Sequence, residues 1–354
     1  MGILLEQTLK RITPPDPRVS HIVRQNLTAI VPEQRSLGRL DEMLRKYASI
    51  RGTSVPDAPQ PCMVVACADH GVARNGVSAY PPDTTRQMTV NYVLPKGASA
   101  NAFANYSGSD MVVADVGVAG DLSGVPGLWH RKVAEGTRDF TRGAAMTGEQ
   151  AIQAVEAGIE IVADRVRHGY NCFTLGEMGI GNTTASAVIV AAFTGLSPAE
   201  VTGRGTGISD AKLKMKTEIV RRALEINQPD RTDGLDVLTK VGGFEIGALA
   251  GVVLGAAAHR CAVVVDGLNT TAAAMIAAAI HPLSRQYLLA SHLSGEPAHI
   301  TALGYLDLEP CLDMGVRLGE AVGASVVVEF LKMSVQLLRA NDLADAAGGQ
   351  CNAC

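Results

Sequence analysis

The sequence predicts an α/β protein with a mainly parallel, Rossmann-like sheet covered by helices on both faces, plus a small helical domain. Short apolar, β-rich runs recur along the chain with helical stretches between them, which is the pattern of parallel strands joined by crossover helices. Each run also ends in polar residues. The expected strands are 63–68, 110–116, 172–175, 261–265 and 286–290. Ligands of such sheets bind outside the carboxyl ends of the strands, so we expect the functional residues there.

Length and composition set the domain organisation. The 354 residues suffice for one large core and an appendage, and the 37 glycines indicate close packing. We expect a large catalytic domain over residues 52–315, a small helical domain formed by 1–51 with 316–340, and a flexible tail over 341–354. The net charge of −4 and the absence of a Lys/Arg run argue against nucleic acid or a membrane surface as a partner. The apolar stretch 246–258 is too short to span a bilayer.

The cysteines indicate a reducing compartment. There are seven, scattered and odd in number, which favours free thiols and a cytoplasmic location. Cys351 and Cys354 form a single CxxC without a second pair, so a flexible tail is a better interpretation than a metal or redox site. The cysteines that lie in or beside apolar runs, as buried thiols do, are Cys62, Cys67, Cys172 and Cys261.

The chain begins with a helical pattern over residues 1–51, which prolines at 14–17 interrupt early. A proline-containing loop at 55–61 then leads into the first strand, and that strand ends in Asp69-His70-Gly71. For His70 the pattern leaves a catalytic base and a core residue equally open.

The stretch 176–184, with the sequence GEMGIGNTT, follows the third strand and precedes a helix over 185–195. Gly179 and Gly181 remove side chains where backbone approaches a ligand, and the helix start offers N–H groups and a positive dipole end to a phosphate. A tight turn capped by Asn182 or Thr183 explains the pattern without a ligand. Glu177 does not help to bind a phosphate, so it suggests a sugar hydroxyl, a cationic group or a proton transfer.

Two further segments explain the glycine and alanine content. Gly243, Gly247, Gly251 and Gly255 recur every four residues, which places them on one helix face that can lie almost in contact with another backbone, in the core or at a dimer interface. Alanines repeat the pattern over 271–280. After Glu320, an apolar helix over 321–338 can pack against the N-terminal helices.

Several polar residues have two interpretations. Glu320 lies in apolar surroundings, where burial would raise its pKa and suit it to accept a proton near neutral pH; an ion pair with Arg317 one helical turn back is equally compatible. His292 is better explained as a capping or core residue than as a base. The alternating lysines are better explained as a solvated surface; they are Lys212, Lys214 and Lys216.

A series of collinear motifs between Ser36 and Glu320 resembles one enzyme family, the nicotinate-nucleotide:5,6-dimethylbenzimidazole phosphoribosyltransferases of cobamide biosynthesis. No single motif carries the resemblance, but the whole series does. The motifs are ADHGV at 68–72, GVSAYP at 76–81, GEMGIGNTT at 176–184, GRGTGI at 203–208, VGGFEI at 241–246, Asp266-Gly267, SHLS at 291–294 and RLGE at 317–320. The segments 31–35, 295–299 and 321–323 depart from the family pattern.

The resemblance implies transfer of the 5-phosphoribosyl group from nicotinate mononucleotide to an aromatic acceptor, with inversion and release of nicotinate. It implies that Glu320 is the general base and that Glu177 belongs to the same site. It assigns the phosphate and ribose to Gly176, Met178, Gly179, Ile180, Gly181, Asn182, Thr183, Gly203, Arg204, Gly205, Thr206, Gly207 and Ser291. It assigns the acceptor to Ser78, Tyr80, Gln87 and Leu318.

The acceptor and the partner subunit stay open at this point. Relatives of the family use phenolic acceptors and consist of two unequal subunits, so the acceptor is a benzimidazole, a purine or a phenol, and the expected dimer has an identical or a homologous second chain. Nicotinate is already a good leaving group, so we expect no metal and no cofactor. A non-catalytic partner subunit is the alternative, against which both glutamates argue. A dinucleotide-dependent oxidoreductase would need a G-x-G-x-x-G turn after the first strand, where Asp69-His70-Gly71 stands instead.

Overall fold

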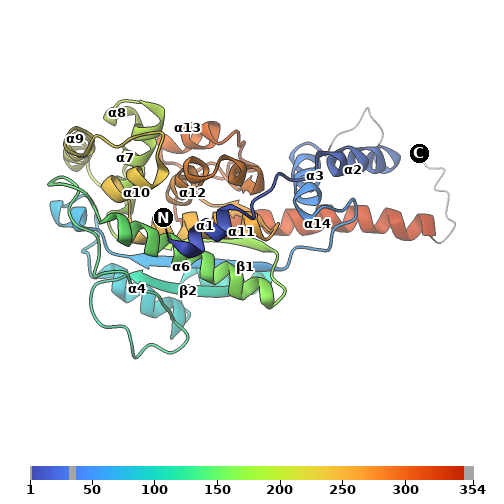
Figure 1. Cartoon of the computed structure of the whole chain (residues 1–354), viewed down its shortest axis with the longest axis horizontal. Helices are drawn as coiled ribbons and strands as arrows, with labels where there is room; N and C mark the ends of the chain where they lie inside the picture. Colours follow the sequence, from blue (N-terminus) through green and yellow to red (C-terminus); the bar gives the residue numbers. More distant parts are fainter. Residues whose placement is uncertain (1, 32–36, 347–354) are drawn as a thin grey trace.

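The computed structural model describes residues 2–31 and 37–346, and its centre is a six-stranded parallel sheet (Figure 1). The strand order is β3-β2-β1-β4-β5-β6. The strands are β1 (Pro61–Ala68), β2 (Asp110–Gly117), β3 (Trp129–His130), β4 (Cys172–Met178), β5 (Ala262–Val265) and β6 (Leu288–Ala290). All five predicted strands are present, and the predicted fold class is confirmed. The short β3 was missed because two residues carry no periodic pattern.

The order of the strands creates a switch point between β1 and β4. The chain runs outward from β1 to β3 in one direction and from β4 to β6 in the other, and β1 and β4 pair in parallel from Pro61 opposite Cys172 to Cys67 opposite Met178. In an open parallel sheet the crevice at such a point, beyond the carboxyl ends of the strands, is where ligands bind.

Helices cover both faces of this sheet, as the sequence predicts. One face packs against α11 (Phe244–Ala258) and α12 (Leu268–Ile280), and α6 (Gly148–Arg167) packs on α11. The other face packs against α4 (Thr84–Val93), α5 (Ser99–Ser107) and the front part of α14 (Val322–Ala346). With both faces covered, β1 is apolar and buried along its whole length.

The remaining elements form the two ends of the molecule and the connections. They are α1 (Ile3–Leu9), α2 (Pro17–Ile30), α3 (Arg39–Arg51), η1 (Gly71–Asn75), α7 (Asn182–Thr194), α8 (Pro198–Val201), α9 (Asp210–Asn227), α10 (Gly234–Val241), η2 (Pro282–Tyr287) and α13 (Ala298–Tyr305). Figure 1 shows α2 and α3 beside α14 at one end of the elongated molecule, and these three helices contact one another. The helix α1 packs instead on α6 and α11. The division into a large and a small domain stays a prediction.

The glycine face of α11 lies against the backbone of α6. A Cβ atom on Gly251 would come within 1.9 Å of the carbonyl oxygen of Val155, and one on Gly158 within 1.8 Å of the carbonyl oxygen of Ala248. The predicted close approach of two backbones is therefore present inside the chain. Every residue of α11 is buried, because α6, α12 and the sheet surround it.

Among the described residues, no helix is long and apolar enough to cross a membrane. The four cysteines expected in apolar runs are buried free thiols. Cys351 and Cys354 lie outside the described residues.

We expect Gly251→Ala to destabilise the protein by at least about 1–3 kcal/mol, because the added methyl group forces the two helices apart. The matched control is Gly304→Ala in α13, where a Cβ meets nothing within 4 Å. That change should be neutral or stabilising by about 0.5–1 kcal/mol, since alanine is the better helix former. Urea unfolding of both variants measures the difference, and equal stabilities would contradict the close helix contact.

Candidate active site

Two adjoining cavities, of about 170 and 870 Å³, open beyond the carboxyl ends of β4, β5 and β6. They share the side chains of Met178, Ile180, Glu296, Leu318 and Glu320 along their boundary. The walls come from the loops that follow the strands and from the segment before α14. The cavities therefore lie at the edge of the sheet where the sequence pattern places function.

The glycine turn at the end of β4 differs in detail from the expected one. The strand continues through Gly176 and Glu177 to Met178, so only Gly179, Ile180 and Gly181 form the turn. Gly181 has φ +102°, a left-handed conformation that favours glycine, and a Cβ atom on Gly179 would come within 2.6 Å of the carbonyl oxygen of Ala68. These glycines let the turn lie directly on the end of β1.

The helix α7 begins without a side-chain cap. Gly181 occupies the N-cap position, so the expected caps Asn182 and Thr183 lie inside the first turn instead. Asn182 donates its amide to the carboxylate of Glu177. The positive end of the α7 dipole therefore faces the smaller cavity, which Asn182 and Thr183 line.

Glu177 is a buried carboxyl group at the floor of the smaller cavity. Burial raises its pKa to about 7, and the nearby carboxyl groups of Glu245 and Glu320 act in the same direction, whereas Asn269 and Asn182 oppose the shift. This group is poised to change its charge near neutral pH, in contrast to an exposed glutamate.

Glu320 reaches the same space from the segment before α14. Burial raises the pKa of its carboxyl group, and the phenol of Tyr92 and the backbone N–H of Ala100 partly offset the shift; the Ala100 N–H donates to Oε2 at 3.4 Å. The expected ion pair with Arg317 on a helix is absent, because α14 begins only at Val322 and residues 317–320 are not helical.

Glycines bring the two carboxyl groups together. A Cβ atom on Gly319 would lie 2.8 Å from Oε1 of Glu177, and one on Gly176 would lie 3.1 Å from the carbonyl carbon of Glu320. Glu320 and Ala321 themselves have φ of +59° and +60°, a conformation that costs free energy for residues other than glycine. The strained backbone at these two residues thus directs the side chain of Glu320 into the cavity.

The second glycine loop, 203–207, forms the wall between the two cavities. Lys216 is completely buried beneath it and donates to Oγ1 of Thr183 at 2.9 Å and to the carbonyl oxygen of Gly203 at 3.1 Å. The N–H of Gly205 donates to Oε1 of Glu296 at 2.8 Å. Burial lowers the pKa of Lys216 to about 8, and Glu296 opposes this shift.

The prediction that Lys216 belongs to a solvated surface is therefore wrong. Lys216, Val220, Ala223 and Asn227 follow one another at intervals of three or four residues, and all four are buried on one face of α9. This period was the signal in the sequence that separates Lys216 from its neighbours Lys212 and Lys214, which are exposed.

The larger cavity has an apolar wall. Met88, Leu213 and Leu318 line it together with Tyr80 and the methyl-bearing side chain of Thr84. The side chains of Tyr80 and Leu318 are 58% and 52% exposed, which leaves this wall open to a flat aromatic molecule.

Two buried histidines lie beside the site. Nε2 of His70 lies 2.6 Å from Oε1 of Glu245, and both side chains are buried. Burial acts to lower the pKa of His70, but the neighbouring Glu245 carboxyl group outweighs burial, so the pKa is raised. This pair lies beneath Gly179, so His70 is a buried core residue of the glycine turn. His292 is also buried and burial lowers its pKa, but it lines the smaller cavity, so its interpretation as a capping or core residue stays a prediction.

The structure places most of the predicted site residues around the two cavities. Those that line them are Tyr80, Glu177, Met178, Gly179, Ile180, Asn182, Thr183, Gly203, Arg204, Gly205, Thr206, Gly207, Leu318 and Glu320. Five others do not line them. Gly176 is inside β4, Gly181 faces His70, Ser78 bonds Thr206, Gln87 bonds Asp83 on the exposed side of α4, and the Ser291 hydroxyl donates to the Asp266 carbonyl.

Sequence reasoning assigned no binding role to several lining residues. They include Thr84, Met88, Leu213, Asn269, Glu296 and Arg317. Thr84 and Met88 are four residues apart on α4, a period that marks one helix face. Leu213 lies on α9, Asn269 at the start of α12, and Glu296 and Arg317 in loops, so only the fold brings these four residues together. Among the described residues, no cluster of three or more His, Cys, Asp or Glu side chains suits a metal ion.

We expect Glu177→Gln to change the pH dependence of stability. The folded-state pKa of about 7 exceeds the ordinary 4.5, so the wild-type carboxyl contributes most to stability below pH 4.5 and loses that contribution as the pH rises through about 7. The loss amounts to about 3 kcal/mol at most. Urea unfolding at about pH 5 and about pH 8 should show the stability of the variant relative to wild type increasing with pH. Parallel pH curves for the two proteins would contradict the assignment.

Comparison with known proteins points to one enzyme family. A family model described as "Phosphoribosyltransferase" matches residues 12–348. The chain is 46% identical over 335 residues to the nicotinate-nucleotide–dimethylbenzimidazole phosphoribosyltransferase of Chloroflexus aggregans, with 95% of each chain covered, and 43% identical over 345 residues to the enzyme of that name from Desulforamulus reducens, with 97% covered.

A crystal structure described as CobT from Thermus thermophilus superposes with a TM-score of 0.87 at 40% identity, over 91% of this chain and 96% of that one. A second structure, of the phosphoribosyltransferase from the same organism, gives 0.86 at 39%, over 92% of this chain and 96% of that one. The chain belongs to the nicotinate-nucleotide–dimethylbenzimidazole phosphoribosyltransferase family, and it is an enzyme of the phosphoribosyltransferase type.

Proposed function

We propose that this enzyme transfers the 5-phosphoribosyl group of nicotinate mononucleotide to 5,6-dimethylbenzimidazole. A nitrogen of the acceptor forms a bond to the anomeric carbon while the bond to the pyridinium nitrogen of nicotinate breaks. The bonding electrons leave with nicotinate, the acceptor loses one proton, and the configuration at the carbon inverts. The product is an α-ribosyl phosphate for cobamide synthesis.

The observation that carries the proposal is that two buried carboxyl groups line the same cavity. One wall beside them is polar and the other is apolar. Glu177 and Glu320 come from segments far apart in the sequence and lie on either side of Gly319. The enzymes of this name to which the chain is 43–46% identical supply the substrate class.

The polar wall suits the nucleotide. The start of α7 lines the smaller cavity with the positive end of its dipole, the loop 203–207 adjoins it, and the ammonium of Lys216 lies directly beneath. We assign the phosphate to this wall. Glu177 and Asn269 then lie beside the ribose hydroxyls, as hydrogen-bond acceptors and donors.

The apolar wall suits the acceptor. An aromatic ring between Leu318, Met88 and Tyr80 lies next to Glu320, which lines both cavities. Glu320 then accepts the proton that the acceptor loses, a role worth about 10²–10⁴ in rate, whereas alignment of acceptor and anomeric carbon supplies about 7–11 kcal/mol. The cationic pyridinium of the substrate favours the ionised form of both carboxyl groups. Glu320 is then ionised and able to accept a proton.

We also propose a dimer, with an identical or homologous second chain near the site. Three apolar side chains at or near the rim of the site are exposed to about half or more, namely Tyr80, Met314 and Leu318. Exposed apolar groups that lie close together are typical of protein interfaces or ligand grooves.

The test of the proposed reaction is nicotinate release by the purified chain from nicotinate mononucleotide, measured side by side with dimethylbenzimidazole, adenine and p-cresol. We expect the highest kcat/KM with dimethylbenzimidazole. A preference for p-cresol would replace the benzimidazole with a phenolic acceptor. Lack of release with every acceptor, from a folded chain, would instead support a non-catalytic partner subunit.

We expect Glu320→Gln to lower kcat by about 10²–10⁴ without a large change in KM for the nucleotide. In the wild type, kcat/KM should rise with pH as the carboxyl of the free enzyme ionises, with a midpoint above 4.5 because burial raises the pKa of Glu320. The Glu320→Gln variant should not show this rise in rate with pH.

The control is Glu149→Gln, an exposed carboxyl in the first turn of α6. It should retain the wild-type profile. A Glu320→Gln enzyme with wild-type kcat would exclude Glu320 as the base.

A further inference from the structure

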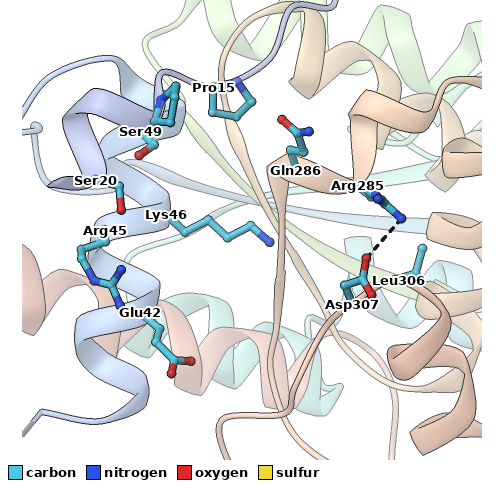
Figure 2. Close-up of a pocket in the computed structure, with 11 residues that line it drawn as sticks. Pro15, Ser20, Glu42, Arg45, Lys46, Ser49, Arg285, Gln286, Leu306 and Asp307 are labelled. Carbon is cyan, nitrogen blue, oxygen red and sulfur yellow. Dashed lines mark ion pairs between the residues drawn. The ribbon is translucent and has the colours of Figure 1, made fainter.

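A third cavity, of about 490 Å³, lies on the other side of the sheet edge from the active site (Figure 2). Its walls come from the start of α2, from α3, from η2 and from the turn after α13. Arg285 and Gln286 precede β6, so they lie at the amino end of that strand, whereas the active site lies beyond its carboxyl end. The cavity shares no lining residue with the active-site cavities, and its volume is in the range of small-molecule sites, about 300–1,000 Å³.

The side chain of Lys46 crosses this cavity. Figure 2 shows it extending from α3 toward the pair formed by Arg285 and Asp307, whose atoms are 3.2 Å apart. Within the described part of the chain Lys46 itself has no ion pair. Burial lowers the pKa of Lys46 to about 8, and the attraction of Asp307 offsets only part of that shift. The ammonium is thus a partly desolvated charge without a counterion.

A second group lacks a partner in the same wall. Ser49, one turn after Lys46 on α3, is 6% exposed, and its hydroxyl has no hydrogen-bond partner among the described residues. Leaving such a group unpaired costs about 1–3 kcal/mol. The hydroxyl of Ser20 and the amide of Gln286 line the same space and add donors.

The other charges of the cavity are paired. Arg45 bonds Asp41 at 2.9 Å, and the carboxylate of Glu42 bonds Arg39 at 2.5 Å. Asp307 is engaged by Arg285. The lining therefore carries three cations against two carboxylates, and both carboxylates already have partners. Arg39 also pairs with Glu309, so among the described residues Lys46 is the lining cation that stands outside the ion pairs, and the arginines retain further N–H donors.

We propose that this cavity binds a small organic anion, whose phosphate or carboxylate group lies on Lys46 and Ser49 and within reach of Arg285. Such a ligand supplies the missing counterion and the missing hydrogen-bond acceptor at once, which is why the two unpaired groups occur together. Pro15 and Pro17 form a rigid wall against the rest of the molecule. The site is independent of the phosphoribosyl transfer chemistry.

The test is competitive acetylation of the full chain at about pH 8, with the extent of modification at each lysine read by mass spectrometry. The probes are inorganic phosphate and malonate, with sodium chloride at equal ionic strength as the reference. We expect phosphate or malonate to slow the modification of Lys46 several-fold and saturably, and whichever protects identifies the head group. Exposed Lys10, at the end of α1, should be unaffected.

Ser49→Ala and Arg285→Gln provide a second measurement. Each should raise the phosphate or malonate concentration needed for half-protection several-fold, and circular dichroism checks that they fold. Unchanged modification of Lys46 in both anions would overturn the proposal, as would equal protection by sodium chloride. A Lys46 that is unreactive even without added anion would also overturn it, because a second copy of the chain then covers the cavity.

Discussion

The structure depends on the burial of two carboxyl groups beside each other at the end of β4. Removing a charge from water is costly, so burial raises the pKa of both Glu177 and Glu320, and the carboxyl groups of Glu245 and Glu320 raise that of Glu177 further. Two glycines make this arrangement possible, because they have no side chains. Without side chains at Gly176 and Gly319, the strand and the segment before α14 approach closely enough to share one space. The proposed cationic substrate would favour the ionised form of both groups.

The rest of the fold holds that space rigid. The parallel sheet has its switch point between β1 and β4, and the glycine turn rests on the end of β1 above the buried pair of His70 and Glu245. The helix α11, in backbone contact with α6, gives the sheet a closely packed support on one face. On the other face, the N–H of Ala324 donates to Asp266 at 2.9 Å and fixes the start of α14, directly after Glu320.

The sequence was sufficient for the fold and for part of the site, and the particular residues show why. Strands buried on both faces are continuous apolar runs, so β1, β2 and β4 could be found without a structure. The motif series, rather than periodicity, brought Glu320 and Glu177 into one hypothesis. Glu296 and Asn269 were not predicted as site residues, because each lies on a segment whose position depends on the whole sheet. Gln87 illustrates the opposite error, since a motif neighbourhood does not say which face of α4 a side chain takes.

The order in which the site is assembled has a consequence for biosynthesis. β4 and its glycine turn leave the ribosome well before the segment that contains Glu320, and that segment is anchored only when α14 begins behind it. A nascent chain therefore has the wall proposed for the nucleotide long before it has the proposed base. Because folding proceeds from the N-terminal side during synthesis, the proposed site stays incomplete until α14 has emerged and docked on the sheet. A chain cut short after α13 would present the proposed nucleotide wall without the carboxyl group of Glu320.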